Sequence, residues 1–530
     1  MRRRSNLLTA FEGRMRLQTP GETIWFRCGF GLLLVYLEFA FFFQNLFLGA
    51  TSPIYLGLSA LAAVPLCAAG VLLARKLRVV CTEPAGKAPR YAALLGSAAT
   101  LAVMLAAQAA FFPGSFNNDN IVQLQQVHSG VYNNWHPVLH TWLFFTLPLK
   151  LVPQYWFIVT AQLVWFSLAV GYLMYVLSDT GCPRWLLVFG WFFTVLNPNT
   201  VDTLLYPVKD AAMSIFCLVL FAQLIRIYHS GGAWLKDWKH AAVFSLFAFL
   251  ALGMRHNAVL LIAPVYVILL CFFRSSRRQT AASAAAVLAA FLFWQNAALP
   301  MAGVENPGSR PVELLGAPMT VLCDIYTTEP QALGEDARAF LEDLAAEEAW
   351  SAYEACNFNS VKWSDPALSD KVNAAGTGTI LGYTLDAALA APKAALRSFA
   401  GLTHLVWGFE NTRGFAMGEE IGYNTLGIQP AYNDTLKFAF TSWREVCNVS
   451  ALKYLFMLLG TVVLFLLFLA VGQLGGGKLG RVMLVLAPMA YDFGTMLLLS
   501  GPDYRFFHMN YVIALPIAYI ILMEKRKTDA

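Results

Sequence analysis

The chain has 530 residues, of which 58% are hydrophobic and only 13% are charged, and its mean hydropathy is +0.55. Soluble domains carry about 25% charged residues, so this composition excludes a soluble globular protein and predicts an all-α integral membrane protein. The net charge of +5 does not predict a nucleic-acid partner, because the basic residues lie in short loops and not on one face, as membrane topology requires.

Apolar segments long enough to cross a bilayer recur along most of the chain, and we expect about 12 transmembrane helices. A shorter apolar segment, 136–152, is expected to form a juxtamembrane helix in the first external loop. The predicted spans cover residues 25–48, 52–74, 91–112, 154–177, 185–197, 210–228, 240–254, 257–273, 279–299, 452–472, 481–500 and 506–523.

The basic loops indicate which side of the membrane each loop faces, because Lys and Arg collect on the cytoplasmic side. If 136–152 lies on the outer surface as an amphipathic or re-entrant helix, both chain termini are cytoplasmic. Four later basic clusters are then cytoplasmic as well: 226–239, 274–278, 478–481 and 524–527. If 136–152 crosses, all four clusters move outside, so we favour the first arrangement.

This topology divides the chain into three parts. Residues 1–299 form an N-terminal membrane domain whose external loops, 113–153, 198–210 and 254–257, carry the candidate catalytic residues. Residues 300–450 are mixed in character and rich in acids, which predicts an external domain or a set of loops with helices. Residues 451–530 form C-terminal membrane helices. The middle part contains Cys323, Cys356 and Cys447, among which one disulfide can form.

The first external loop contains one acid, Asp119, and no Lys or Arg occurs from Tyr91 to Leu149. A carboxylate at the outer surface can act as a general base or bind a divalent ion such as Mg²⁺ or Mn²⁺. It can equally be the N-cap of a helix that starts near Ile121. Asn118 and Asn120 flank Asp119 and can hold it, or a substrate, by hydrogen bonds.

His136 and His140 lie four residues apart, on one face of a predicted helix. This spacing can bind zinc, but a zinc site needs a third ligand, and the chain has no His-Glu-x-x-His motif. We therefore expect His136 to form a hydrogen bond to an acceptor or to a phosphate. The alternative is that His136-Pro137 only starts a helix, because proline is favoured in the first turn.

Three further external segments place charges beside apolar helices. Charged residues in such positions are costly unless they are matched or functional, although a lysine there can also extend its amine to the membrane surface. Arginine and lysine at the outer boundary suit a bound anion, and a lipid phosphate fits that position. The segments contain Lys209 and Asp210, then Arg255 and His256, then Asp503 and Arg505.

The chain has no Walker loop, no Rossmann glycine pattern after a strand and no Gly-x-Ser-x-Gly motif, which argues against ATP as an energy source. Taken together, the external motifs resemble those of the GT-C superfamily of membrane glycosyltransferases. That superfamily includes the protein O-mannosyltransferases and the lipid A aminoarabinose transferases, and a poorly characterised bacterial group is most similar. The resemblance rests on Phe112–Gly114 with Asp119, Trp135–Leu139, Asn197-Pro198, Lys209-Asp210, Arg310–Leu315 and Asp503–Arg505.

The resemblance implies a multi-pass enzyme of the bacterial plasma membrane with an external active site. Its donor would be a polyprenyl-phosphate-linked sugar, and its acceptor a glycan, lipid or protein of the cell envelope. Asp119 matches the acid that acts as base or holds a metal ion, and no other cofactor is expected. Lys209, Arg255 and Arg505 would neutralise the leaving phosphate.

The chain departs from the family pattern in one respect. Many relatives carry two acids in the first loop, whereas here Asn118 and Asn120 flank a lone Asp119. This departure leaves it undecided whether the enzyme needs a metal ion. It also makes Asp210 and Asp503 the candidates for a second acid. Other functional classes also remain: a polymerase or ligase of surface polysaccharide, a transporter or lipid flippase, and a scaffold built on 300–450.

Overall fold

The computed structural model describes residues 19–47, 52–83, 86–306, 311–409 and 419–525, together with Gly13, Met15 and Leu17. The basic residues at the two termini, 2–4, 14, 16 and 526–527, lie outside these ranges, as does Arg310 of the sequence motif above. The chain is 78% helical. The only strands within the described ranges are β1 (Val79–Cys81) and β2 (Met523–Lys525), which pair in parallel.

The prediction of an all-α membrane protein is confirmed at this level. Within the described residues, seven helical segments are long and apolar enough to cross a membrane. Five of them are single helices: α2 (Pro20–Phe47), α3 (Pro53–Lys76), α4 (Ala88–Ala110), α8 (Tyr155–Asp179) and α11 (Lys209–His229). The sixth, Arg274–Met301, consists of η4 (Arg274–Ser276), α14 (Arg277–Phe293), η5 (Trp294–Ala298) and α15 (Leu299–Met301). The seventh consists of η9 (Tyr504–Phe507) and α28 (Met509–Leu522).

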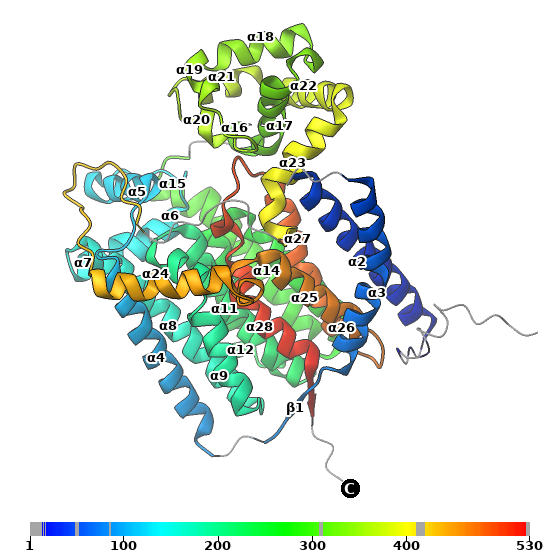
Figure 1. Ribbon diagram of the computed structural model, residues 1–530. Helices are drawn as coiled ribbons and strands as arrows, with labels where there is room; N and C mark the ends of the chain where they lie inside the picture. The colour runs from blue at the N-terminus through cyan, green and yellow to red at the C-terminus, as the bar shows by residue number, and fades with distance from the viewer. Residues whose placement is uncertain are drawn as a thin grey trace, which may run out of the picture.

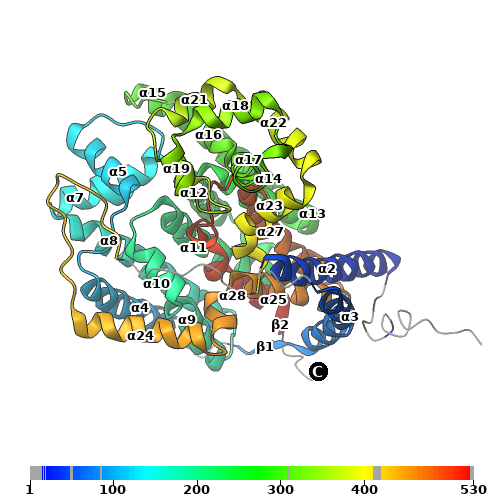
Figure 2. The ribbon, with the colours of Figure 1, turned by 45° about the horizontal axis from the view of Figure 1, so that its top comes forward.

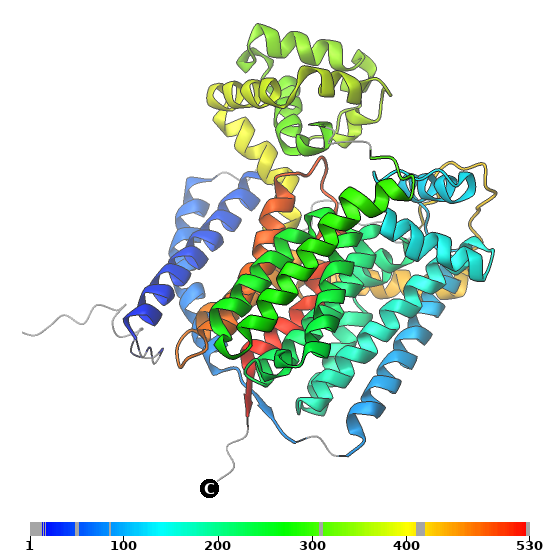
Figure 3. The ribbon, with the colours of Figure 1, turned by 180° about the vertical axis from the view of Figure 1, so that it is seen from behind.

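Shorter apolar helices complete the bundle, and the count of about 12 spans stays a prediction. They are α6 (Val138–His140) with η1 (Thr141–Thr146) and α7 (Leu147–Leu151), α9 (Arg184–Val195), α12 (Trp238–Met254), η3 (His256–Ala258) with α13 (Val259–Phe272), and α25 (Leu459–Gly472). The predicted span 481–500 is divided into α26 (Leu479–Val482), η8 (Met483–Val485) and α27 (Leu486–Met496). Figure 3 shows the green helices of residues 238–301 crossing the bundle from one end to the other.

The predicted cytoplasmic loops meet at one end of the bundle, at the bottom of Figure 1. Tyr228 donates a hydrogen bond to the carbonyl of Gly480 (2.8 Å), and the amine of Lys478 donates one to Glu524 (2.9 Å). Arg78 lies 3.7 Å from the same Glu524. Loops that are far apart in the sequence therefore share this basic end, as the favoured topology requires.

The other end of the bundle carries the Asp119 loop. Helix α11 starts at Lys209 and ends at His229, beside Tyr228 at the basic end. Its 21 residues extend over about 31 Å, which matches a hydrocarbon core about 30 Å thick. Lys209 and His229 thus lie roughly one membrane thickness apart.

Segment 138–151 begins and ends at this second end of the bundle. His136, just before it, contacts Lys209 at the start of α11. Tyr155, just after it, lies 3.2 Å from the Nε2 atom of His128 on α5 (Asn118–Ser129). The segment therefore does not cross the bundle, which is the arrangement that the basic loops favoured.

Residues 198–205 differ from the open loop that the sequence predicted. They form α10 (Pro198–Leu205), and every side chain of this helix is buried. Asn197 caps the helix by accepting a hydrogen bond from the amide of Asn199, whose side chain reaches Tyr511 at 2.8 Å. Polar groups beside the apolar α9 thus obtain partners inside the bundle.

Part of the predicted external region forms a separate helical unit at the Asp119 end, which stands apart from the bundle in Figure 1 and is seen from above in Figure 2. We call it the small domain, and it has its own hydrophobic core between Val312 and Ala391. Its elements are α16 (Pro311–Leu314), α17 (Gly316–Thr328), η6 (Pro330–Ala332), α18 (Glu335–Leu344), α19 (Glu347–Ser351), α20 (Asn359–Lys362), α21 (Leu368–Ala375) and α22 (Thr377–Ala390).

Two further helices of the predicted external region, among its described residues, pack on the bundle. Helix α23 (Pro392–Trp407) leads back to it, and Tyr36 of α2 donates a hydrogen bond to the carbonyl of Trp407 (3.0 Å). Helix α24 (Asp434–Val449) lies across α4 (Figure 1), and η7 (Lys453–Met457) joins it to α25. No disulfide joins the nine cysteines, all of which are described; Cys323 and Cys447 lie in different cores.

The α4–α8 contact depends on a glycine. A Cβ atom at Gly171 of α8 would lie 2.9 Å from the carbonyl oxygen of Ala93 and would clash with Ser97. We expect Gly171→Ala to destabilise the protein by about 1–3 kcal/mol, because the backbones would have to separate. The midpoint of thermal unfolding in detergent measures this.

Gly31→Ala in α2 is the matched control, since nothing lies within 4 Å of its Cβ position. In a helix interior alanine is favoured over glycine, so Gly31→Ala should leave the midpoint unchanged or raise it. An equal rise for Gly171→Ala would show that the close approach of α4 and α8 does not contribute to stability.

Candidate functional site

Asp119 lies in the first turn of α5, but it does not cap this helix. Asn117 is the cap: its side chain accepts a hydrogen bond from the amide of Asn120, and the Asn120 side chain accepts one from the amide of Asn117, both at 3.1 Å. The alternative role of Asp119 as the N-cap is therefore wrong. Its side chain is 41% exposed, so it remains accessible from outside.

The two asparagines beside Asp119 have different surroundings. Asn120 is fully buried, and its side-chain amide donates a hydrogen bond to the backbone carbonyl of Pro207 (3.0 Å). It thereby joins the first external loop to the segment that precedes Lys209. Asn118 is exposed, and Gly422 packs closely against it. Asn120 is thus a structural link, while Asn118 stays exposed beside Gly422.

Asp119 is surrounded by cations that come from distant parts of the chain. The guanidinium of Arg505 lies 3.9 Å from its carboxylate. Partial burial alone would raise the pKa of Asp119, but the positive charges of Lys209 and Arg505, and that of His136 when it is protonated at low pH, outweigh burial and hold that pKa below its usual value. The Asp119 carboxylate is therefore ionised at neutral pH.

His136 and Lys209 face each other beside Asp119. The Lys209 amine lies 3.4 Å from the Nδ1 atom of His136. Burial, together with the positive charge of Lys209, lowers the pKa of His136 to about 4, so the ring is neutral near pH 7 and its Nδ1 can accept from Lys209. Within the described ranges no acidic side chain lies within ion-pair distance of Lys209. Lys209 is thus a cation available to an anionic ligand.

Arg255 is already paired. Its guanidinium forms an ion pair with Asp210, the residue after Lys209, and donates a hydrogen bond to Asn257 (2.6 Å). The side chains of Asp210 and Arg255 are 1% and 13% exposed. Asp210 therefore lies beneath the surface of the site, where it holds Arg255 and has no open face for a substrate.

Arg505 lies between Asp119 and Asp503. Its Nε atom is 2.6 Å from the Asp503 carboxylate, which also accepts a hydrogen bond from the Arg505 amide. The ring of Phe506 packs against both arginines, with its centroid 4.5 Å from the guanidinium of Arg255 and 5.1 Å from that of Arg505. The two arginines are therefore close neighbours.

His256 contacts the site through a polar chain. Its Nε2 atom lies 3.2 Å from the amide of Gln295, whose oxygen accepts a hydrogen bond from Asn134 (2.9 Å). The side-chain oxygen of Asn134 in turn accepts a hydrogen bond from the backbone amide of Val138, the first residue of α6 (3.2 Å). His256 is thereby linked to the position of His136, and Gln295 is a residue that the sequence did not indicate.

The two histidines at helical spacing have different partners, since His136 contacts Lys209 and His140 contacts Gln123. His140 is fully buried, and its Nδ1 atom lies 2.9 Å from the amide of Gln123. In the described part of the chain no three His, Cys, Asp or Glu side chains are grouped so as to hold a metal ion. Asp119 is therefore still the candidate ligand for Mg²⁺ or Mn²⁺ that the sequence indicates. Among the described residues it is not part of a group of three such side chains.

Three charged residues of the site were not identified from the sequence. Lys362 of the small domain is 2% exposed and forms an ion pair with Glu313. Its positive charge also helps to lower the pKa of Asp119. Glu420 follows a segment outside the described residues and lies near Arg505 and Asp119. Glu313 falls within a motif that carried the family resemblance, whereas Lys362 and Glu420 have no local signal.

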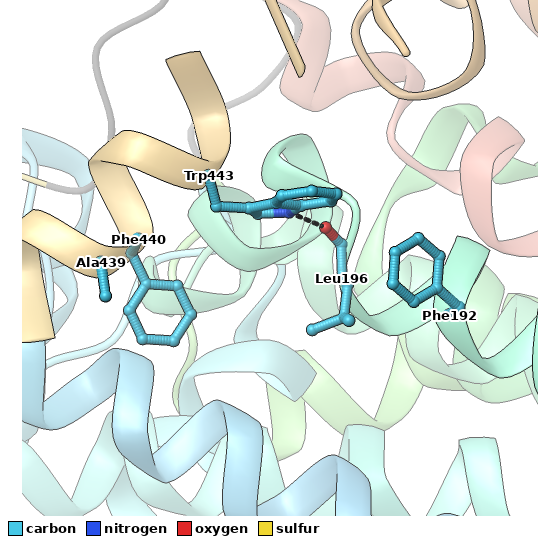
Figure 4. A pocket seen from close by; sticks show the side chains of 5 residues that line it. All are labelled: Phe192, Leu196, Ala439, Phe440 and Trp443. Carbon is cyan, nitrogen blue, oxygen red and sulfur yellow. Dashed lines mark hydrogen bonds between the residues drawn. The ribbon is translucent and has the colours of Figure 1, made fainter. Parts of the chain in front are cut away.

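An apolar cavity of about 250 Å³ lies between α9 and α24, away from these charges (Figure 4). Phe192 and Leu196 form one side of it, and Ala439, Phe440 and Trp443 form the other. The indole of Trp443 donates a hydrogen bond to the carbonyl of Leu196 (2.7 Å). This lining suits a hydrocarbon chain and offers no charged partner to a ligand.

The chain matches no protein-family model, no curated protein and no solved structure. Its function is therefore inferred from the geometry of the site.

The buried pair of Asp210 and Arg255 gives a prediction about stability. Arg255→Leu leaves the Asp210 carboxylate buried without its cation, which should destabilise the protein by about 3–5 kcal/mol. The additional change Asp210→Asn removes that charge and should restore much of the loss. Thermal unfolding of the two variants in detergent tests this.

Lys209→Gln is the control in the same cluster, because Lys209 has no acidic partner at ion-pair distance in the described residues. Its unfolding midpoint should stay near that of the wild type. If Arg255→Leu is as stable as Lys209→Gln, the Asp210–Arg255 pair does not hold the site together.

Proposed function

We propose that the protein is an inverting glycosyltransferase that moves a sugar from a polyprenyl-phosphate carrier to an acceptor of the cell envelope. One observation carries this proposal: an accessible carboxylate, Asp119, lies with Lys209, His136 and Arg505 at one end of the helical bundle. The four residues are far apart in the sequence, and the basic loops lie at the opposite end. A carboxylate and several cations are what transfer from a lipid phosphate to a hydroxyl requires.

In the proposed reaction, Asp119 takes the proton of an acceptor hydroxyl. The hydroxyl oxygen attacks the anomeric carbon of the donor sugar from the face opposite the phosphate, and a new carbon–oxygen bond forms with inversion. The bond between the anomeric carbon and the phosphate oxygen breaks, and the polyprenyl phosphate leaves with the electron pair. Protein donors and cations placed around this oxygen stabilise the developing charge.

Lys209 is the principal phosphate ligand in this proposal, because it lacks an acidic partner within ion-pair distance among the described residues. Arg505 shares its charge with Asp503 and Asp119, and Arg255 is engaged with Asp210. Arg255 therefore supports the site from below. The apolar cavity beside α24 lies at the other end of α10 from Tyr206 and suits a lipid tail.

We place the site on the external face of a bacterial plasma membrane, with about 12 spans and both termini in the cytoplasm. The clustering of Arg78, Tyr228 and Lys478 at the opposite end supports this orientation through the rule that basic loops are cytoplasmic. A divalent ion, where bound, would use Asp119. The steps above use only side chains of the chain itself.

Asp119→Asn should reduce sugar transfer by about 10²–10⁴-fold, because a general base is lost, while the unfolding midpoint is maintained. Polyprenyl phosphates that carry different labelled sugars are the donors, and envelope fractions supply the acceptor. Transfer of the label measures activity. The control is Asp434→Asn, an exposed acid at the start of α24. Full transfer by Asp119→Asn would remove this residue from the mechanism.

Lys209→Gln should weaken the binding of polyprenyl phosphate by about ten- to hundredfold, as expected for the loss of one charge-assisted hydrogen bond. The stabilisation that the lipid gives against thermal unfolding measures its affinity. Lys150→Gln, an exposed lysine at the same end of the bundle, should bind as the wild type does. Equal stabilisation of both variants, or equal stabilisation by polyprenol without phosphate, would contradict a phosphate site at Lys209.

A further inference from the structure

Residues 419–433, which we call the strap, run along the first external loop. The amide of Phe116 donates a hydrogen bond to the carbonyl of Glu420 (2.9 Å), and the amide of Gly422 donates one to the carbonyl of Phe116 (2.7 Å). Gly422 also packs against Asn118, where a Cβ atom would lie 2.6 Å from the side-chain oxygen. The strap thereby fixes the backbone of Glu420 beside the start of α5, close to Asp119.

The Glu420 side chain faces this site. Tyr206, Arg505, Asp503 and Asp119 are the neighbouring groups that act on the ionisation of its carboxyl group. The residue is exposed, so a ligand can reach it. The carboxyl group itself is partly shielded from water, and this partial burial raises the pKa of Glu420; Arg505 opposes this rise, and Asp503 and Asp119 add to it.

The site thus has two sides of different charge. One side holds Lys209 and the neutral His136. Its positive charge comes from Lys209, since the charge of nearby Arg255 is balanced by Asp210. The other side holds Glu420 and Asp503, with Tyr206 between the loops. Arg505 and Asp119 lie between the two sides, 3.9 Å apart. A phosphate is attracted to the first side and repelled by the second.

The small domain extends this acidic character. Residues 311–391 contain thirteen acidic and three basic side chains, a formal net charge of −10 in a chain whose total is +5. The domain contacts the loop that carries Asp503, since the amide of Asn359 donates a hydrogen bond to the carbonyl of Ser500 (3.1 Å). Any acceptor that approaches past this domain meets a negative surface.

We propose that Glu420 is the acceptor-binding carboxylate of the site, and that the acceptor is a neutral or cationic polyhydroxylated molecule such as a glycan. This inference rests on the glycosyltransferase function proposed above. In it, one acceptor hydroxyl gives its proton to Asp119 and attacks the sugar, while a second hydroxyl or an ammonium group donates a hydrogen bond to Glu420. An acceptor rich in phosphate or carboxylate is disfavoured, because like charges repel at this side of the site.

The test compares Glu420→Gln with Glu419→Gln in the full-length protein in membrane vesicles. Glu419 is the preceding residue of the strap and pairs with Lys437 on the surface (3.1 Å), so the two changes remove the same charge at neighbouring positions. Glu420→Gln should reduce transfer from labelled polyprenyl-phosphate sugar by about tenfold or more, because a hydrogen bond to a charged group is lost. Glu419→Gln should transfer as the wild type does, and both should bind polyprenyl phosphate normally.

The pH profile separates ligand binding from support of the strap. Glu420 accepts the hydrogen bond in its ionised form, so transfer by the wild type should fall as pH drops through its raised pKa. In Glu420→Gln the acid limb should move to lower pH, and Glu420→Asp should recover part of the activity. An unchanged acid limb, or transfer at the wild-type rate in Glu420→Gln, overturns the assignment.

The acceptor class is tested with neutral, amino-sugar and phosphate-bearing oligosaccharides offered to the wild type. Transfer to the first two and little to the third is expected; preferred use of the phosphate-bearing acceptor overturns the proposal. A wild-type protein that neither binds polyprenyl phosphate nor consumes any of the donors would instead reject the glycosyltransferase function itself. The two failures are therefore distinguishable.

Discussion

The buried ion pair between Asp210 and Arg255 is the contact around which the charged end of the bundle is organised. Asp210 lies in the first turn of α11, which crosses the bundle, and Arg255 follows the last residue of α12. A buried charge without a partner is strongly destabilising, so the ends of these two helices must stay together. Phe506 packs on Arg255 and on Arg505, which extends the constraint to the C-terminal part of the site.

Sequence patterns predicted the membrane helices and the gathering of Asp119, His136, Lys209, Arg255 and Arg505, because apolar length and basic loops are local signals. Each of these residues adjoins a span on the same predicted side, so sidedness alone brings them to one end. The position of Glu420 could not be predicted in this way. It depends on a backbone pairing with Phe116 across about 300 residues of chain, for which no local pattern exists.

The helix cap was a different kind of difficulty. Asn and Asp are about equally good N-caps, so Asn117 and Asp119 could not be separated by residue type. The geometry selects Asn117 and leaves the carboxylate of Asp119 exposed to the site. Similarly, Pro198–Leu205 was predicted as part of an external loop but forms a buried helix. Its polar side chains can be buried because they find hydrogen-bond partners inside the bundle, as Asn199 does in Tyr511.

The ionisation of Asp119 is favoured from several directions, since Lys209 and Arg505 lie near it and it occupies the positive N-terminal turn of α5. A carboxylate stabilised in this way is a weak base. On the proposed function, the donor phosphate would change this balance, because its negative charge offsets Lys209 and raises the pKa of Asp119 toward a value suited to proton transfer. Base strength would then depend on donor binding, and an acceptor hydroxyl would be deprotonated chiefly when a sugar is in place to receive it.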